Sequence, residues 1–168
     1  MELIDRINKR KIYYVQIRNN STWKSSLPKN GWVAFTIANE EDGELIPPCV
    51  KICIDRNVSY TCSAGSYANM TEQYFDEEIT WRGVEYEMNT KKEFDYELSP
   101  VTTAHKNFGA GFWFATTLAY DDNFEIDKVV CIDFTKRKVK KHLIDLIDKI
   151  NDGWLPDDEE IKPPEYDN

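Results

Sequence analysis

Short runs of apolar and aromatic residues alternate with clusters of turn-forming residues along most of the chain. Runs of this kind, bounded by Gly, Pro, Asn or Asp, are typical of β-strands. Eight segments are candidates for strands, of which we expect six or seven to join one sheet: 11–18, 32–38, 50–54, 58–62, 79–88, 94–98, 111–118 and 128–134. The segment 58–62 is predicted to form a hairpin with 50–54. The aromatic-rich 111–118 is predicted to be a central strand buried on both sides.

In two segments the apolar residues are spaced as in an amphipathic helix instead. Leu3, Ile4 and Ile7 fall on one side of a short helix predicted over 2–10. The clearer pattern is at the other end of the chain and predicts a helix over 136–150. Its apolar residues recur at helical spacing, at Val139, Leu143, Ile147 and Ile150.

These elements predict an α+β fold with a mainly antiparallel, twisted sheet of six or seven strands. The C-terminal helix is expected to pack on one face of that sheet. With 168 residues the chain is long enough for a single domain. We expect this domain over 1–155, followed by an acidic, mobile tail over 156–168.

Charge and composition narrow the classes of function. The formal net charge of −9 argues against direct nucleic-acid binding, which depends on Lys and Arg, and favours a protein partner with a basic surface. No apolar run approaches the roughly 18 residues of a membrane span, so we expect no membrane association. No secretory signal is visible and the four cysteines form no tight framework, which predicts a cytoplasmic protein with reduced thiols.

The cysteines and histidines do not predict a metal site. Cys49 and Cys53 are separated by three residues, whereas Cys62, Cys131 and His105 are distant. A structural zinc site usually has two close pairs of ligands, and here there is one loose pair. We therefore expect buried thiols and an ordinary loop histidine.

The strongest charge cluster lies between Glu72 and Glu97. It contains nine acidic residues against three basic ones, a local net charge of −6, interleaved with aromatics. So many like charges cannot be buried together, and a basic partner would relieve their repulsion. The predicted contact residues in this segment are Glu72, Tyr74, Phe75, Asp76, Glu77, Glu78 and Tyr86.

A basic run, Lys136, Arg137 and Lys138, opens the predicted C-terminal helix. Positive charge is unfavourable at a helix N-terminus, so local stability does not explain this run. Two interpretations remain open. The run either neutralises acidic segments of the same molecule or binds an anion or an acidic partner.

Three short motifs supply an alternative. Trp81-Arg82-Gly83-Val84, Phe114-Ala115-Thr116-Thr117-Leu118 and Asp158-Glu159-Glu160-Ile161 occur in this order. The order resembles the Arg, Ser-Thr-Ser, Glu series of mono-ADP-ribosyltransferases, although alanine stands at the first serine position of the middle motif. The resemblance implies NAD as cofactor, with Arg82 gripping its phosphates, Thr116 ordering the site and Glu160 stabilising the ribosyl cation.

Of these readings, binding is favoured over catalysis. The sequence predicts an acidic, aromatic-rich protein that binds another macromolecule and blocks or modulates it. Its size and acidity are similar to those of the small inhibitors that phages make against host or defence proteins. The alternative is a nucleotide-dependent enzyme of the kind that the motif order implies.

Overall fold

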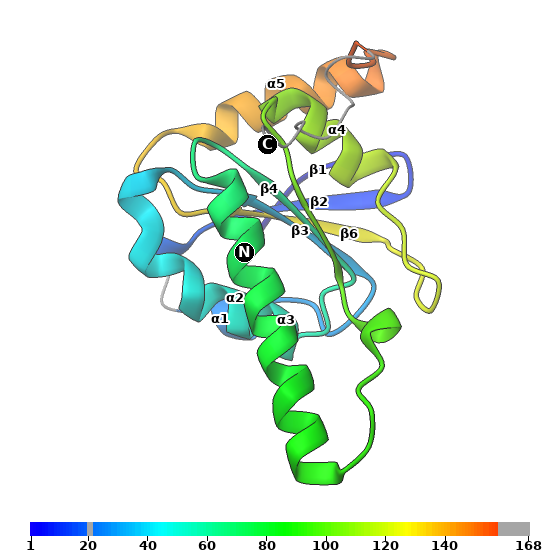
Figure 1. Ribbon diagram of the computed structural model, residues 1–168. Helices are drawn as coiled ribbons and strands as arrows, with labels where there is room; N and C mark the ends of the chain where they lie inside the picture. Colours follow the sequence, from blue (N-terminus) through cyan, green and yellow to red (C-terminus); the bar gives the residue numbers. More distant parts are fainter. Residues whose placement is uncertain (20–21, 158–168) are drawn as a thin grey trace.

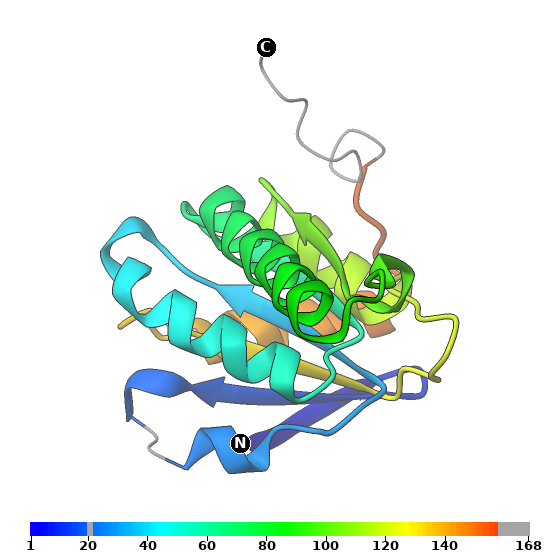
Figure 2. The ribbon, with the colours of Figure 1, turned by 60° about the horizontal axis from the view of Figure 1, so that its bottom comes forward.

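The computed structural model describes residues 1–19 and 22–157, which form one six-stranded sheet with helices on both faces (Figure 1, Figure 2). The strands are β1 (Glu2–Ile7), β2 (Arg10–Gln16), β3 (Trp32–Ile37), β4 (Tyr60–Ala64), β5 (Val101–Ala104) and β6 (Lys128–Asp133). The α-helices are α1 (Trp23–Ser26), α2 (Ile46–Asp55), α3 (Ala68–Thr90), α4 (Phe108–Thr117) and α5 (Val139–Asn151). Three short 3₁₀ helices complete the described elements, η1 (Ile17–Asn19), η2 (Glu40–Leu45) and η3 (Tyr96–Leu98).

The sheet is mixed, with the strand order β1-β2-β6-β3-β4-β5. Only β1 and β2 pair in antiparallel fashion, whereas the other four pairings are parallel. The expectation of a single-sheet α+β fold with a C-terminal helix is confirmed, and the expectation of a mainly antiparallel sheet is wrong. Parallel neighbouring strands need long crossover connections. Most of the segments that were wrongly expected to be strands belong to the helices of these crossovers.

The first corrections fall in the N-terminal half. Residues 2–10 form strand β1 and the turn after it, because Asn8 takes a positive φ of 52° and reverses the chain into β2. The segment 50–54 lies in α2, where prolines occupy the first helical positions, as is common. Strand β4 is accordingly no hairpin partner, and Tyr60 pairs in parallel with Val33.

The other corrections concern residues 79–88, 94–98 and 111–118. The first belongs to the long helix α3, and the second is a turn that contains η3. The third is α4, a helix with aromatics on several sides. A continuous apolar run of this length does not distinguish a buried strand from a buried helix.

Two apolar cores hold the layers together. On one face of the sheet α4 and α5 cover a core that includes Phe35, Phe112 and Leu143. On the other face α1, α2 and α3 cover a core that includes Trp32 and Phe75. The opposed helix layers are visible in Figure 2, where α2 and α3 lie on one side of the sheet and the orange α5 on the other. Among the described residues, no helix combines the length and the apolar character that crossing a bilayer requires.

The packing of α5 gives a first test. Leu143 is fully buried between α5 and the sheet, so Leu143→Ala is expected to lower the free energy of unfolding by about 2–5 kcal/mol through the cavity it leaves. Chemical denaturation measures this directly. The exposed Asp145 on the same helix provides the control, because Asp145→Ala should change stability by less than about 0.5 kcal/mol. Equal stability of the two variants would contradict the packing of this face.

Candidate functional site

The acidic segment is a helix that is longer than the sheet it covers. Helix α3 has 23 residues, which corresponds to about 35 Å, whereas the five residues of β4 span about 17 Å. The first half of α3 buries Thr71 and Phe75 against the sheet. The second half runs past the edge of the sheet, as Figure 1 shows. We call residues 80–100, which comprise this second half and the segment that returns to β5, the arm.

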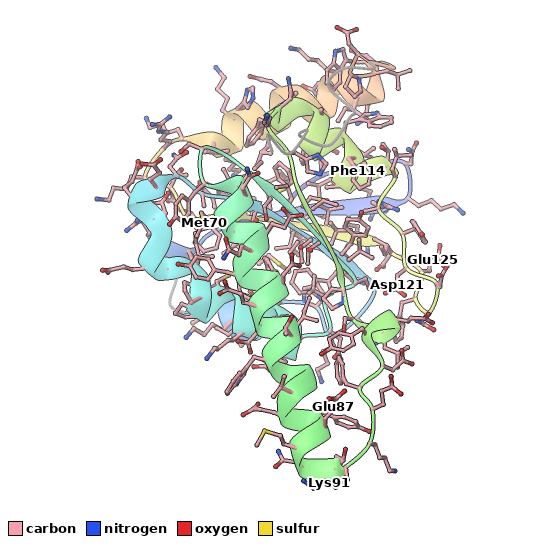
Figure 3. All side chains as sticks on the ribbon, in the orientation of Figure 1. Met70, Glu87, Lys91, Phe114, Asp121 and Glu125 are labelled. Carbon is pink, nitrogen blue, oxygen red and sulfur yellow. The ribbon has the colours of Figure 1, made fainter. Side chains whose placement is uncertain are left out.

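The arm has a defined internal structure. Lys91 ends α3 in the left-handed conformation (φ 58°), and the chain then folds back along the helix. The ring of Phe94 packs edge-on against Tyr86 and Tyr96, with ring centroids 5.7 and 4.8 Å apart. Gly83 leaves room for this packing, because a Cβ there would clash with the hydroxyl end of the Tyr96 ring. Figure 3 labels Glu87 on α3 and Lys91 at the tip of the arm.

The surface of the arm combines carboxylates with exposed apolar side chains. Trp81 is 60% exposed and Met88 is 67% exposed, although neither residue type favours water. The exposed large apolar residues of the arm are Trp81, Val84, Tyr86, Met88, Tyr96 and Leu98. Such a concentration of exposed apolar groups is typical of an interaction site.

A groove of about 410 Å³ runs between α2 and α3, beside the base of the arm. Its walls are aromatic and acidic on the α3 side and are completed by α2. The lining residues are Pro47, Val50, Lys51, Tyr74, Glu77, Glu78 and Trp81.

Arg82 fixes the two helices that form the groove. Its guanidinium group contacts Glu78 at 2.9 Å and Asp55 of α2 at 2.8 Å, and it donates a hydrogen bond to the Lys51 carbonyl oxygen. Partial burial lowers the pKa of Arg82, but the hydrogen bonds with Glu78 and Asp55 outweigh this effect and raise its pKa overall. Arg82 therefore stays charged and holds the groove in shape.

The structure distributes six of the seven predicted contact residues of the acidic segment over three environments. Tyr74, Glu77 and Glu78 line the groove, and Tyr86 lies on the arm. Glu72 and Asp76 lie closer to β5. The Thr102 hydroxyl donates to Asp76 at 2.5 Å, while burial first and the charge of Asp76 second raise the pKa of Glu72.

Phe75 requires a correction. Its side chain is fully buried in the core beneath α3, so it supports the helix and presents no surface to a partner. Sequence reasoning also missed the α2 wall of the groove and the exposed Val84, Met88 and Leu98. A helical reading of 68–90 would have placed Tyr74, Trp81 and Met88 along one stripe, because they are spaced by seven residues.

The basic run lies at the opposite edge of the sheet. Lys136, Arg137 and Lys138 are exposed in the connection from β6 to α5, at the carboxyl ends of the parallel strands. The arm extends past the amino ends of the same strands, because α3 returns from the end of β4 to the start of β5. The structure does not bring the basic run and the arm together.

The motif residues of the alternative are also separated. Arg82 lies on α3, whereas Thr116 is buried on α4, on the other side of the sheet. The Thr116 hydroxyl donates to the carbonyl oxygens of Phe112 and Trp113 in its own helix. Glu160 lies outside the described residues. The first two motifs therefore share no site in this structure.

His105 and the cysteines are buried. His105 follows β5, is 8% exposed and packs its ring against Phe114, with Nε2 3.1 Å from the Thr103 hydroxyl oxygen. Burial lowers the pKa of His105 to about 4. All four cysteines are buried and free of disulfide bonds, and burial raises the pKa of Cys62 to about 12. Within the described ranges, no group of three or more His, Cys, Asp or Glu side chains is placed to hold a metal ion.

The burial of His105 predicts a pH dependence of stability. The pKa of His105 is about 4 in the folded state and about 6.5 in the unfolded state. Its contribution to the free energy of unfolding is therefore fully present above pH 6.5 and is lost as the pH falls toward 4. Between pH 6.5 and 5 the wild type should lose about 1.5 kcal/mol through this residue. Urea unfolding at the two pH values should show the loss in the wild type and in His142→Gln, which alters an exposed histidine, but not in His105→Gln. The same loss in His105→Gln would show that His105 is not the source of the loss, and hence that its ring in the wild type is accessible to water.

Comparison with known protein families gives one match. Residues 12–150, from β2 to α5, match the family model described as "Domain of unknown function (DUF7684)". No curated protein and no solved structure matches the chain. The matched region includes both walls of the groove and the whole arm. Because the match covers more than half of the chain, the protein belongs to the DUF7684 family.

Proposed function

We propose that the protein binds a second protein with a basic surface through the arm and the groove, and thereby blocks or modulates that partner. The observation that carries the proposal is the projecting half of α3, which exposes Trp81 and Met88 among carboxylates. The acids would steer a basic partner toward the arm and speed association. The aromatics would supply most of the binding free energy once the two surfaces meet.

The groove supports the same function. Trp81 and Tyr74 offer aromatic surface beside Glu77 and Glu78, so an apolar or cationic side chain of the partner can be enclosed there. Arg82 already ties α2 to α3, and the aromatic cluster around Phe94 orders the return segment. A surface that is ordered before binding loses little conformational entropy on association.

The shape of the arm favours blocking over simple docking. A helix that projects from the body of a small protein can enter a cleft of its partner and occupy it. The compositional similarity to phage inhibitors of host or defence proteins suggests a partner of that kind, and inhibition of the captured partner's own activity would test this part of the proposal.

Charge reversal on the arm tests the electrostatic part. Asp76 and Glu78 bond to Thr102 and Arg82, so reversal there would also disturb the fold. Glu77→Lys combined with Glu85→Lys changes exposed positions on one side of α3 and should slow association with the partner by about tenfold or more at low salt. The salt dependence of the association rate should become flatter.

The partner for this measurement is captured from the native host with the wild-type protein as bait and identified by mass spectrometry. The control is Glu41→Lys with Glu44→Lys, which changes the net charge equally on η2, at the carboxyl edge of the sheet. The proposal requires the control to associate at close to the wild-type rate. Equal slowing of both variants would mean that overall charge, and not the arm, steers the partner.

Truncation of the central aromatic tests the short-range part. Trp81→Ala removes the largest exposed ring of the groove and should weaken binding by at least about 30-fold, mainly through faster dissociation. Its exposure means that the free energy of unfolding should change little. Leu155→Ala, which truncates a similarly exposed apolar side chain outside the groove and the arm, is the control. Unchanged dissociation of Trp81→Ala would place the contact elsewhere.

A further inference from the structure

The apolar side chains on the outer surface of α3 fall on one face of the helix. Trp81, Val84 and Met88 are separated by three and four residues, and all three are exposed. At about 100° per residue, these positions and that of Tyr74 lie within about 80° of one another around the helix axis. We call these four residues the seam. It begins in the groove at Tyr74 and runs outward along the arm to Met88.

The return segment of the arm leaves the seam uncovered. It runs along another side of α3, where Tyr96 lies against Gly83 and Phe94 against Tyr86 (Figure 1). Positions 83 and 86 are about 140° or more from the centre of the seam around the helix axis. Helix α2 approaches the seam at its base, where it completes the groove. Within the described chain, the outer part of the seam therefore stays exposed.

The spacing of the seam is that of a coiled coil. Tyr74, Trp81 and Met88 follow one another at seven residues, and Val84 lies three residues after Trp81, as a and d positions do. Such a face packs against a second helix, whose side chains repeat over the same distance of about 10.5 Å. An extended strand repeats its side chains on one face about every 7 Å and adds to the free backbone groups of a sheet edge, which a helix does not offer.

The charges beside the seam indicate the kind of helix that fits. Glu77, Glu85 and Glu87 are exposed on the same side of α3 or next to it. The groove also has Lys51 on its α2 wall, while the charge of Arg82 is matched by its ion pairs, so this face is net acidic. A helix with Lys or Arg beside its apolar positions is complementary to it. Two copies of this chain joined through their seams would instead bring like charges together.

We propose that the seam binds one amphipathic helix of the partner, with apolar residues on Trp81, Val84 and Met88 and basic residues beside the glutamates. The inference rests on the function proposed above and names the structural class of the partner. The seam is about 21 Å long from Tyr74 to Met88, which corresponds to about four turns of a partner helix. At the base of the arm this helix lies in the groove and contacts α2 as well as α3.

Synthetic peptides of three heptads test the inference. The probe has Leu at positions a and d, Lys at e and g, Ala or Gln elsewhere, and a fluorescent label. Repulsion between its lysines opposes pairing of the peptide with itself. Fluorescence anisotropy should show binding to the protein, and circular dichroism should show a gain of helix in the mixture. A peptide with Glu in place of Lys should bind at least about tenfold more weakly. A Lys peptide with two central prolines, which interrupt the helix, should be weakened as much.

A charge placed in the seam shows whether the peptide binds there. Met88→Glu should weaken binding of the Lys peptide by at least about tenfold, although the added negative charge alone would favour a basic peptide. Met88 is 67% exposed, so the free energy of unfolding should hardly change. The matched control is Leu155→Glu, which adds the same charge at a side chain that is 66% exposed and lies outside the arm. Its affinity for the peptide should equal that of the wild type or exceed it slightly.

Four results would overturn the inference. They are no binding of the Lys peptide, equal binding of the Glu peptide, equal binding of the peptide with prolines, and unchanged binding by Met88→Glu. Equal binding of the peptide with prolines would assign the face to an extended segment. Dimerisation of the protein alone, measured by sedimentation and abolished by Met88→Glu, would assign it to a second copy of the chain and would also overturn the inference.

Failure of the helix is distinguishable from failure of the proposed function. If Trp81→Ala weakens binding of the captured partner but the Lys peptide does not bind, the arm is a contact surface and the helical partner is wrong. If Trp81→Ala leaves the captured partner bound as before, the function proposed for the arm fails as well.

Discussion

The parallel insertion of β6 between β2 and β3 is the constraint on which the rest of the structure depends. Residues Val129 to Ile132 are fully buried, and the strand pairs along its length with both neighbours. The chain builds β3, β4 and β5 outward in one direction, with α2 and α3 on one face. It must then return to the centre to add β6, and α4 makes this return on the other face. Both faces of the sheet are thereby covered, which parallel strands require.

The same arrangement leaves the end of α3 without a sheet to cover. The apolar groups in its first half are used by the core, while a pattern of acids and scattered aromatics continues beyond the last strand residue it can contact. The carboxylates of this half would lose their hydration if the arm packed against the body, which opposes such a collapse. Aromatic contacts between α3 and the return segment replace the missing sheet. The arm is ordered by its own side chains, and its outer surface is left available.

The sequence pattern predicted an element correctly where only one type of secondary structure fits that pattern. β-Branched runs predicted β3 and β6, and a clean helical stripe predicted α5. It failed for α2 and α4, whose compact apolar sequences suit a buried strand as well as a helix, and for α3, whose two halves face different environments. The order of the strands in the sheet depends on contacts between segments that are distant in sequence, so it could not be predicted from local patterns. For the same reason the acidic segment was identified as exposed, whereas the groove that it forms with α2 was not.

A close approach within the arm places the return segment beside the groove. α3 supplies one wall of the groove through Trp81, and two residues further along the helix Gly83 lies against Tyr96 of the return segment. A Cβ at position 83 would meet the hydroxyl end of the Tyr96 ring, so a larger residue there would require that ring to shift. A glycine in the middle of an exposed helix costs about 1 kcal/mol relative to alanine, so its presence is explained by this close approach and not by the stability of the helix itself.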